Sequence, residues 1–237
     1  MVGQQVSSIA IVTGGSSGIG KAISIKLAEE GITVIIADIA FPDHTHENIH
    51  FRLCNVTLGD EVDSFYQWVL ENVGVPDILI LNAGRGIHEK LTEGDPEKWF
   101  YIFNLNVMGA LRLIRRFVPK MVERESGKVI FISSVSEGNS YTYGGIYSAS
   151  KAALENVAET LRLETSPHIN VSIIAAGITE TDFFNNQISG HSKNPIEEIG
   201  MSSLSSEDIA DDVLYTISKK GEASINKIVT RPVGQTF

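Results

Sequence analysis

The clearest indication of the fold comes from Ser8 to Asp38, a stretch that reads SIAIVTGGSSGIGKAISIKLAEEGITVIIAD. It begins with a short apolar run, Ile9 to Val12, which is typical of a buried parallel strand. A turn rich in glycine and serine follows, and Ile19 to Glu30 then carries apolar residues at helical spacing before a glycine ends the helix. Because Val34 to Ala37 supplies a second apolar strand, the stretch predicts one right-handed βαβ unit of a parallel sheet.

The turn after the first strand has the pattern of a dinucleotide-binding loop. Gly14, Gly18 and Gly20 let the backbone turn sharply and approach a pyrophosphate, whose charge would lie against the amide groups of the helix N-terminus. Glycine-rich turns are common in ordinary flexible loops, but here a strand precedes the turn, a helix follows it, and an acidic residue stands 18 positions beyond Gly20. That residue, Asp38, is placed to bind the ribose hydroxyls of NAD, and no Arg or Lys follows it to receive the 2′-phosphate of NADP. The sequence therefore favours NAD as the cofactor.

Length and charge exclude several classes of protein. A chain of 237 residues with 43% hydrophobic residues is long enough for one large α/β domain and too short for two, so residues 1–237 are expected to form a single domain. Nineteen basic and 29 acidic residues give a formal net charge of -10, which opposes binding to nucleic acid or to an anionic membrane. With one cysteine, Cys54, and no apolar run approaching 18 residues, the chain is expected to be a cytoplasmic protein.

A second stretch, Lys128 to Lys151 (KVIFISSVSEGNSYTYGGIYSASK), carries residues suited to acid–base chemistry. Its apolar start predicts a buried strand that ends at Ser134, and its end opens an Ala-rich helix on which Tyr147 and Lys151 share one face at i and i+4. A lysine charge close to a phenol favours the phenolate, so this pairing would make Tyr147 a usable acid or base near neutral pH. Ser134 can donate a hydrogen bond to the same substrate oxygen. The stretch thus predicts proton exchange with an alcohol or a carbonyl.

The connection between Asp38 and the next expected strand, Ile49 to Val56, is too short for a crossover helix. It contains Pro42 and shows no apolar periodicity, so the second crossover is expected to be curtailed. His44 and His46 in this segment form an HxH pattern, but no third ligand lies nearby in the sequence. Both are therefore expected to be solvated loop histidines, and no metal site is predicted.

Helices and strands alternate along the rest of the chain. Helices are expected at 58–72, 95–125, 147–164 and from 206 onward, and strands at 78–81, 129–132, 171–175 and 225–230, with a polar insertion at about 182–203. The long helical run at 95–125 is interrupted by Asn104, Asn106 and Gly109. Because asparagine is unfavourable inside a helix, Asn106 is either a tolerated surface residue or part of a kink that turns its amide inward.

Together these residues resemble the short-chain dehydrogenase/reductase (SDR) family along nearly the whole chain. The matching motifs are TGxxxGxG at 13–20, NAG at 82–84 and YxASK at 147–151. Ser134 lies 13 residues before the tyrosine, as the family pattern requires, and Asn106 matches the family's fourth catalytic residue. Any one of these motifs arises by chance in unrelated chains, but their common order and spacing does not.

The resemblance implies a Rossmann-type α/β fold, a doubly wound sheet of seven parallel strands in the order 3-2-1-4-5-6-7. Helices would cover both faces, and the cofactor would lie across the carboxyl ends of the strands. The resemblance further implies that Tyr147 is the general acid/base, that Lys151 lowers the pKa of this tyrosine and holds the nicotinamide ribose, and that Ser134 orients the substrate oxygen. Asn106 would hold a water that links Lys151 to solvent.

The same resemblance implies the remaining contacts. The cofactor would be bound by Gly14, Ser16, Ser17, Gly18, Ile19, Gly20, Asp38, Asn55, Val56, Asn82, Ala83, Gly84, Tyr147, Lys151, Gly177, Thr179 and Thr181. The substrate would be contacted by Arg85, Ser136 and Tyr141 and covered by the loop at about 182–203. Two residues depart from the family pattern. Ala176 replaces the usual proline before Gly177, which leaves that loop less rigid, and Asn55 replaces a common aspartate, although its carbonyl oxygen can still accept the N6 amino group of adenine.

The predicted function is that of an oxidoreductase that transfers a hydride between NAD and a polar secondary alcohol or ketone. The C-terminal segment 226–237 resembles the end of the 3-hydroxy-acid dehydrogenase branch, which makes a hydroxy acid one candidate substrate. Two alternatives stay open: an NADP-dependent carbonyl reductase, and a catalytically silent NAD-binding protein on the same fold.

Self-association is also predicted. The helices at 99–121 and 152–163 carry more apolar residues than one sheet face needs, among them Phe117, Leu154, Val157 and Leu161. Since the family resemblance implies that these two helices pair with their symmetry mates, a homodimer or homotetramer is expected. The competing interpretation is that both helices simply lie on the sheet and that the surplus is ordinary exposed apolar surface.

Overall fold

The structure of the chain, a computed structural model, describes residues 8–139, 141–183, 185–190, 202–219 and 223–235. Its centre is a sheet of seven strands whose pairings are all parallel and whose order is β3-β2-β1-β4-β5-β6-β7. The strands are β1 (Ile9–Thr13), β2 (Thr33–Asp38), β3 (Ile49–Leu53), β4 (Ile78–Leu81), β5 (Gly127–Ser134), β6 (Ile169–Ala176) and β7 (Lys227–Thr230). The strand order reverses between β1 and β4, which is where ligands bind in sheets of this class. The predicted Rossmann-type sheet and its strand order are confirmed.

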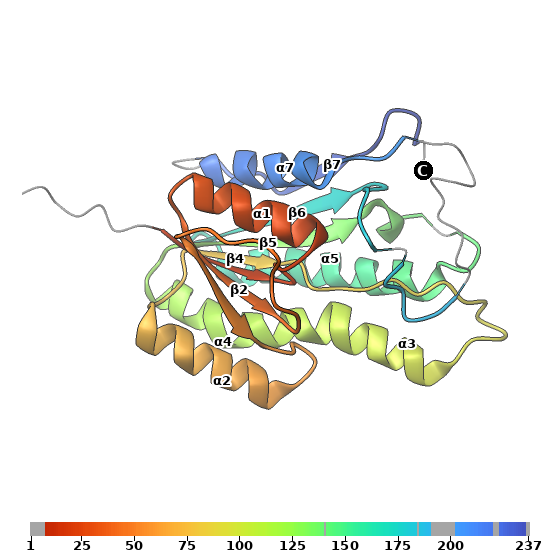
Figure 1. The fold of residues 1–237 in the computed structure, drawn as a ribbon, viewed down its shortest axis with the longest axis horizontal. Helices are drawn as coiled ribbons and strands as arrows, with labels where there is room; N and C mark the ends of the chain where they lie inside the picture. The colour runs from red at the N-terminus through yellow and green to blue at the C-terminus, as the bar shows by residue number, and fades with distance from the viewer. Residues whose placement is uncertain (1–7, 140, 184, 191–201, 220–222, 236–237) are drawn as a thin grey trace, which may run out of the picture.

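Helices cover both faces of the sheet (Figure 1). One face carries α1 (Gly18–Glu29) and α7 (Ser206–Ser218), and the other carries α2 (Gly59–Asn72), α4 (Gly109–Glu123) and α5 (Gly145–Thr165). The two layers share each strand: Ala10 and Val12 of β1 belong to the core of α1 and α7, whereas Ile11 belongs to the core of the other three helices. Because both faces are buried, the central strands are continuously apolar, which is the pattern that the sequence shows.

The long helical run predicted for 95–125 is divided by a π-helical turn. Helix α3 (Pro96–Phe103) passes through η1 (Asn104–Met108) into α4, and Asp95 caps the start of α3 by accepting a hydrogen bond from the backbone of Glu97 at 3.0 Å. Such π-helical turns occur often at functional sites. Asn106 lies in this turn with 2% of its surface exposed, so the alternative of an inward amide is the one that the fold adopts.

The second crossover is curtailed as predicted, because residues 39–48 between β2 and β3 form no helix. Strand β3 ends at Leu53 rather than at Val56, because the chain turns there toward α2. The expectation that both histidines of this segment are solvated is wrong for His44, whose side chain is only 8% exposed. His46 accepts a hydrogen bond from the backbone NH of Asn48 at 3.1 Å. Within the described parts of the chain, no group of three or more His, Cys, Asp or Glu side chains could hold a metal ion.

Of the predicted substrate loop at 182–203, residues 184 and 191–201 lie outside the described residues. The assignment of residues 1–237 to a single domain stays a prediction. Among the helices that are described, none is long and apolar enough to cross a membrane.

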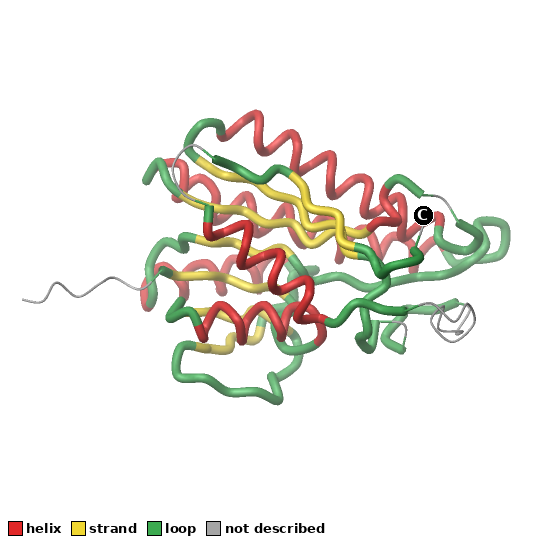
Figure 2. The backbone as a smooth tube through the Cα atoms, turned by 90° about the horizontal axis from the view of Figure 1, so that it is seen from above, coloured by secondary structure: helices red, strands yellow, loops and turns green. Residues whose placement is uncertain are grey.

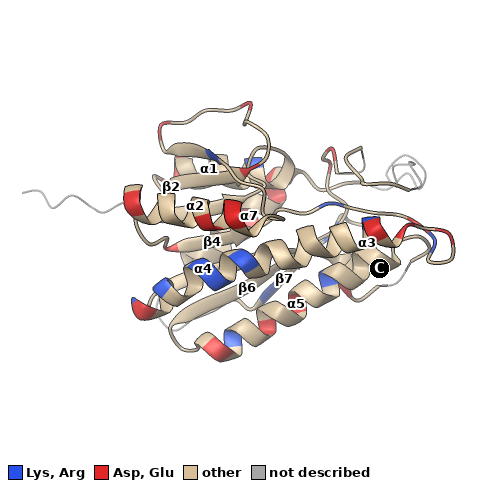
Figure 3. Ribbon diagram, turned by 90° about the horizontal axis from the view of Figure 1, so that it is seen from below, with Lys and Arg blue, Asp and Glu red and all other residues tan. Residues whose placement is uncertain are grey.

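The apolar residues that predicted an interface between subunits lie mostly inside this subunit. Phe117, Leu154 and Leu161 are 0%, 3% and 6% exposed and belong to the core beneath α4 and α5, so these three side chains do not reach the surface. Val157 is only partly buried, and an interface on these helices stays a prediction. Exposed apolar side chains include Leu163 of α5 at 83%, Phe100 of α3 at 71% and Met108 of η1 at 44%. Figure 3 views α3, α4 and α5 from below and shows that several basic residues lie on α4.

Candidate active site

A cavity of about 780 Å³ opens at the carboxyl ends of the strands, the end toward which the strand arrows point in Figure 1. Seen from above in Figure 2, long loops gather at this same edge of the sheet. Residues that follow β1, β2, β3, β4, β5 and β6 make its wall, so the cavity spans the point where the strand order reverses. Its volume is in the usual range for cofactor and ligand sites.

Almost all of the predicted site residues line this cavity. The wall includes three of the four predicted catalytic residues and all three predicted substrate contacts: Ser134, Tyr147, Lys151, Arg85, Ser136 and Tyr141. The other predicted cofactor residues on the wall are Gly14, Ser17, Gly18, Ile19, Gly20, Asp38, Asn55, Val56, Asn82, Ala83, Gly84, Gly177, Thr179 and Thr181. The two predicted residues that the wall does not include are Ser16 and Asn106, and both are engaged in other contacts.

The glycines of the first loop are required by backbone geometry and close contacts. Gly14 and Gly18 have φ angles of +64° and +51°, a region that favours glycine. A Cβ atom on Gly20 would lie 2.0 Å from the carbonyl oxygen of Gly14 and 2.5 Å from Nδ2 of Asn82. That amide donates hydrogen bonds to the carbonyl oxygens of Thr13 and Gly14 at 2.9 and 3.1 Å. Asn82 therefore shapes the glycine loop from the end of β4.

Asp38 is held in one orientation by backbone NH groups. Its Oδ1 accepts hydrogen bonds from Ile39 and Ala40 at 2.7 and 3.2 Å, and its Oδ2 accepts one from Ser16 at 3.0 Å. Ser16 is buried, and its hydroxyl donates to the carbonyl oxygen of Ala40 at 2.7 Å. The Ser16 side chain therefore ties the glycine loop to the end of β2, and its predicted part in cofactor binding stays a prediction. The result is a fixed carboxylate on the cavity wall beside that loop.

Asn55 offers the cavity a different group from the one expected. Its Oδ1 accepts hydrogen bonds from the backbone NH and the hydroxyl of Thr57 at 3.0 and 2.7 Å, and its backbone NH donates to Glu61 at 2.8 Å. A carbonyl oxygen accepts two hydrogen bonds, so this oxygen is already occupied within the described chain, and its acceptance of the adenine N6 amino group stays a prediction. The group that remains for a ligand is the Nδ2 amide, which is a donor.

The rest of the wall carries polar groups that suit a dinucleotide. Ser17, the N-cap residue of α1, makes no side-chain capping hydrogen bond within the described chain, and the first turn of α1 holds no acidic residue. The backbone NH groups of this turn can therefore serve an anion such as a pyrophosphate. Ser133 is buried at the end of β5 on the cavity wall, and its hydroxyl has no hydrogen-bond partner among the described residues. These residues and the glycine loop fit NAD or NADP.

Burial dominates the ionisation of Tyr147. The side chain is 7% exposed, and burial raises the pKa of the phenol above its ordinary value; the nearby Tyr141 raises this pKa further, and a hydrogen bond with Ser134 acts in the opposite direction. The loss of hydration of a buried phenolate is the largest influence on the pKa of this phenol. The opposing effect of Lys151 on the pKa of Tyr147 stays a prediction.

The ammonium group of Lys151 lies near the ring of Tyr147 and is hydrogen-bonded to the backbone of β5. Its Nζ is 5.8 Å from the centroid of the tyrosine ring and donates a hydrogen bond to the carbonyl oxygen of Ile132 in β5 at 3.0 Å. Burial lowers the pKa of Lys151 to about 8, while the carboxylate of Glu155 acts to raise it. A lysine with such a pKa carries its charge at neutral pH and loses it under mildly alkaline conditions.

Asn106 joins three elements next to the site. Its Nδ2 donates to the carbonyl oxygen of Arg85 at 3.1 Å and to the hydroxyl of Ser150 at 3.0 Å, and its Oδ1 accepts from the backbone NH of Arg85 at 2.9 Å. The buried amide thus fixes the loop after β4 against the first turns of α5. These contacts give Asn106 a positioning role, and a water between this residue and Lys151 stays a prediction.

A hydrogen-bonded group on the cavity wall joins the predicted substrate contact Tyr141 to two further residues, His88 and Gln187. Nδ1 of His88 contacts Oε1 of Gln187 at 2.5 Å, and its Nε2 contacts the hydroxyl of Tyr141 at 2.9 Å. The imidazole ring lies 6.4 Å from the ring of Tyr147, which also packs 5.4 Å from Phe183. Burial lowers the pKa of His88, so its imidazole is neutral at neutral pH. No local motif signals this group, because its members lie 53 and 99 positions apart.

The loop after β6 is held by the C-terminal segment. The backbone NH of Gly177 donates to the carbonyl oxygen of Thr230 at 2.7 Å, and that of Ile178 donates to Oε1 of Gln235 at 3.0 Å. A Cβ atom on Gly177 would lie 2.6 Å from the same Oε1, so the segment approaches this loop closely. Ala176 pairs in register with Thr230. Strand pairing and Gln235, which the prediction did not include, thus supply the restraint that a proline at Ala176 would have added.

Comparison with known proteins finds a family that matches most of the chain. Residues 8–191 match the family model described as short chain dehydrogenase. An uncharacterized oxidoreductase of Staphylococcus saprophyticus is 30% identical over 236 residues, which covers 95% of this chain and 97% of the relative. An uncharacterized oxidoreductase of Staphylococcus aureus is 30% identical over 234 residues, with the same shares covered.

Solved structures have the same fold. A serine dehydrogenase complexed with NADP+ superposes with a TM-score of 0.89 at 24% identity, covering 97% of this chain and 96% of that one. An alcohol dehydrogenase from the archaeon Thermococcus sibiricus, complexed with 5-hydroxy-NADP, gives a TM-score of 0.83 at 22% identity, covering 97% and 98%. The aldohexose dehydrogenase of Thermoplasma acidophilum gives 0.85 at 21% identity, covering 95% and 92%. At these identities the likeness establishes the fold alone.

Proposed function

The chain belongs to the short-chain dehydrogenase family, and from this premise we propose that it is an NAD-dependent oxidoreductase that interconverts a polar secondary alcohol and its ketone. The observation that carries the proposal is that Ser134, Tyr147 and Lys151 lie on the wall of the same cavity as the glycine loop. The loop and Asp38 supply groups suited to a dinucleotide, and Tyr147 supplies a transferable proton. A cavity that combines both can bring the two reactants together.

The chain's own residues would handle the proton, while a bound nicotinamide cofactor would accept or donate the hydride. Because burial raises the pKa of Tyr147, its phenol is protonated at neutral pH and can donate to the oxygen of a ketone substrate. The hydroxyl of Ser134, which is hydrogen-bonded to Tyr147, can turn to the same oxygen and fix its position. For alcohol oxidation the phenolate must form, and the ammonium of Lys151 is the nearby charge that favours it.

The wall of the cavity favours a polar substrate. Arg85, Ser136 and Tyr141 line it, and the guanidinium of Arg85 pairs with no carboxylate in the described chain. A substrate carboxylate can accept two hydrogen bonds from a guanidinium in a fixed geometry, so a hydroxy acid is the class that this wall suits best.

A substrate panel tests the proposed function. Hydroxy acids, polyols and cyclic alcohols would each be assayed with NAD and with NADP, and formation of the reduced cofactor would be followed by its absorbance. We expect the highest kcat/KM for a hydroxy acid with NAD. Binding of NAD without turnover of any member would contradict the proposal and favour a catalytically silent NAD-binding protein.

An NADP-dependent carbonyl reductase is the competing proposal. In its favour, the similar serine dehydrogenase and alcohol dehydrogenase are described with NADP+ and 5-hydroxy-NADP. Against it stands Asp38, a carboxylate fixed where an adenosine 2′-phosphate would need a cation. The lysine and arginine side chains on the described cavity wall are Lys151 of α5 and Arg85 after β4, and neither belongs to the segment that carries Asp38. NAD is therefore the cofactor that we propose.

Replacement of Lys151 by methionine is expected to impair both cofactor binding and turnover. The variant keeps a long apolar stem but removes the ammonium proposed to hold the nicotinamide ribose and to favour the phenolate. We expect a loss of roughly tenfold in affinity for NAD and a fall in kcat on the order of 10²-fold. Fluorescence titration with NAD and steady-state kinetics measure the two effects separately. An unchanged affinity for NAD would refute the ribose role.

A homodimer or homotetramer is also proposed, now with α3 and η1 as the contact surface. Phe100 and Met108 are exposed there, whereas Leu154 is buried in the subunit core and its replacement would test folding rather than assembly. Sedimentation velocity is expected to show a species larger than the 25.8 kDa monomer, and Phe100→Glu is expected to dissociate it. A single species at the monomer mass would contradict the proposal.

A further inference from the structure

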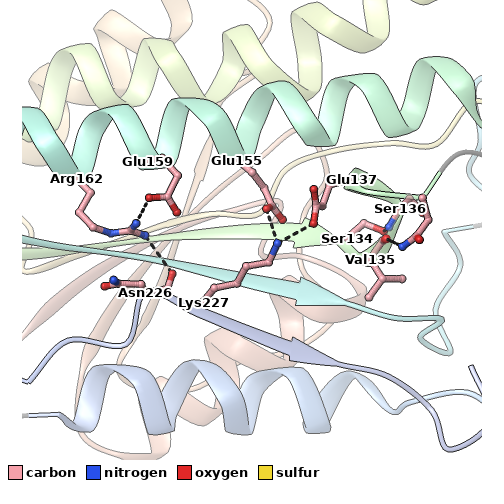
Figure 4. Close-up of polar contacts among 10 residues, drawn as sticks. Ser134, Val135, Ser136, Glu137, Glu155, Glu159, Arg162, Asn226 and Lys227 are labelled. Atoms are coloured by element: carbon pink, nitrogen blue, oxygen red, sulfur yellow. Dashed lines mark hydrogen bonds and ion pairs between the residues drawn. The ribbon is translucent and has the colours of Figure 1, made fainter. Parts of the chain in front are cut away.

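A charge network lies behind the catalytic lysine. In Figure 4, Lys227 of β7 reaches two carboxylates, Glu155 of α5 at 2.6 Å and Glu137 of η2 (Val135–Glu137) at 2.8 Å. The short helix η2 follows directly on Ser134, and Glu155 stands one helical turn beyond Lys151. The network therefore joins the two elements that carry the proposed catalytic groups.

Glu155 is the most deeply buried member of this network. Its side chain is 11% exposed, compared with 31% for Lys227 and 29% for Glu137. Its Oε2 accepts the hydrogen bond from Lys227, but its Oε1 is buried and accepts no hydrogen bond from the described residues. A buried carboxylate oxygen without a donor is unfavourable, and each such atom in a folded protein calls for a reason. The ion pair with Lys227 does not explain why this carboxylate lies so deep.

The position of Glu155 on α5 suggests that reason. We infer that Glu155 is a positioning residue whose negative charge keeps Lys151 in its ammonium form. Their i and i+4 spacing places the two side chains on one face of the helix. Lys151 is itself buried, and its Nζ donates to the carbonyl oxygen of Ile132, so bulk water does little to stabilise its charge. The inference rests on the proposed function, in which Lys151 must be charged to act.

The electrostatic surroundings of Lys151 agree with this inference. Burial lowers the pKa of Lys151 to about 8, and the carboxylate of Glu155 opposes that effect. Besides Lys227 and Glu137 of the network, the titratable or charged groups on the described cavity wall with Lys151 are Asp38, Cys54, Arg85, His88, Tyr101, Tyr141, Tyr143, Tyr147 and Asp182. If the charge of Glu155 is removed, the pKa of Lys151 falls further, and the ammonium is lost at a lower pH. The active pH range should then shrink from its alkaline side.

Glu155→Gln tests this link. The substitution removes the charge, keeps the shape, and leaves Lys227 paired with Glu137, so no buried cation is left without a partner. The ionisation of Lys151 can be followed in the ligand-free protein through the ¹³Cε signals of its lysines, with the signal of Lys151 identified by its loss in Lys151→Met. We expect the acid dissociation constant of Lys151 to rise about tenfold in Glu155→Gln. The alkaline limb of the pH profile of kcat/KM should move to lower pH, where the proton activity is about tenfold higher.

Two matched variants separate a charge effect on Lys151 from a structural effect of the ion pair. Glu137→Gln removes the other partner of Lys227, and Glu159→Gln removes a carboxylate one turn further along α5 that pairs with Arg162 (Figure 4). Neither should change the dissociation constant of Lys151. Glu155→Asp keeps the charge and should restore most of the wild-type value.

An unchanged dissociation constant of Lys151 in Glu155→Gln, or an equal change in Glu137→Gln, would overturn the inference. If Glu155→Gln does not fold, the double variant Glu155→Gln/Lys227→Gln removes the whole pair and carries the same expectation for Lys151. Because the signal is recorded without substrate or cofactor, it distinguishes the two proposals. An inactive wild type would refute the proposed function, whereas the response of Lys151 to Glu155 decides the inference.

Discussion

Replacement of Tyr147 by phenylalanine is expected to lower kcat by roughly 10³-fold or more while NAD still binds. The ring remains to fill its place near His88 and Phe183, and only the transferable proton is lost. Since no other described group on the cavity wall is a protonated phenol hydrogen-bonded to Ser134, no neighbour can take over the transfer. Steady-state kinetics with the best substrate of the panel and fluorescence titration with NAD measure the two parts of this expectation.

A matched variant makes the Tyr147 test specific. Ser134→Ala removes a donor that orients the substrate oxygen but leaves the phenol in place, so we expect a smaller loss, on the order of 10²-fold in kcat. Residual activity of more than a few per cent in Tyr147→Phe, or a larger effect of Ser134→Ala than of Tyr147→Phe, would contradict the assignment of Tyr147 as the acid/base.

Cofactor choice is expected to show the second large effect, with kcat/KM for NAD exceeding that for NADP by a factor on the order of a hundred. The carboxylate of Asp38 is held by the backbone NH groups of Ser16, Ile39 and Ala40, so it cannot turn away from an adenosine 2′-phosphate. A phosphate next to this fixed charge would be repelled, whereas ribose hydroxyls can donate hydrogen bonds to it. Comparable values of kcat/KM for the two cofactors would refute this account.

Two variants of Asp38 separate its charge from its support of the loop. Asp38→Ala should narrow the gap between kcat/KM for NAD and kcat/KM for NADP. It also removes the acceptor for the backbone NH of Ser16. Asp38→Asn keeps an oxygen acceptor and removes the charge. We therefore expect Asp38→Asn to narrow the gap with a smaller loss of affinity for NAD. A gap that persists in both variants would place the discrimination elsewhere.

The fold followed from local patterns in the sequence. The apolar run at Ile9, the glycine turn and the strand that ends at Asp38 predicted the first βαβ unit, because the periodicity of apolar residues directly reflects which faces are buried. The short segment after Asp38 correctly predicted a curtailed crossover. The strand order came from the family resemblance rather than from these patterns. Every buried strand has the same apolar pattern, whatever its position in the sheet.

The sequence does not show how polar side chains are used within the chain or which apolar faces are covered. The sequence places Ser16 and Asn55 near a cofactor but does not show that the Ser16 hydroxyl is taken by Ala40 and the Asn55 oxygen by Thr57. The same holds for the apolar surplus on α4 and α5. Composition counts apolar residues on a helix, but only packing shows that Leu154 lies in the core of its own subunit.

Long-range partners were beyond the reach of the sequence. The group around His88 and the pairing of Lys227 with Glu155 join residues that lie 53 to 99 positions apart, and nothing in the spacing of either signals its partner. Only the i and i+4 spacing of Lys151 and Glu155 can be read directly from the sequence. The raised pKa of Tyr147 could not be predicted because the sequence shows which charges are near but not how completely a group is removed from water.

The proposal that Tyr147 is the acid/base of an NAD-dependent oxidoreductase is tested most directly by the absorbance of reduced cofactor. Wild type and Tyr147→Phe would each be mixed with NAD and every member of the substrate panel. We expect reduction of NAD by at least one polar alcohol in the wild type and no measurable reduction in Tyr147→Phe at equal NAD occupancy. Equal rates in the two proteins, or no reduction of NAD or NADP by any member of the panel in the wild type, would contradict the proposal.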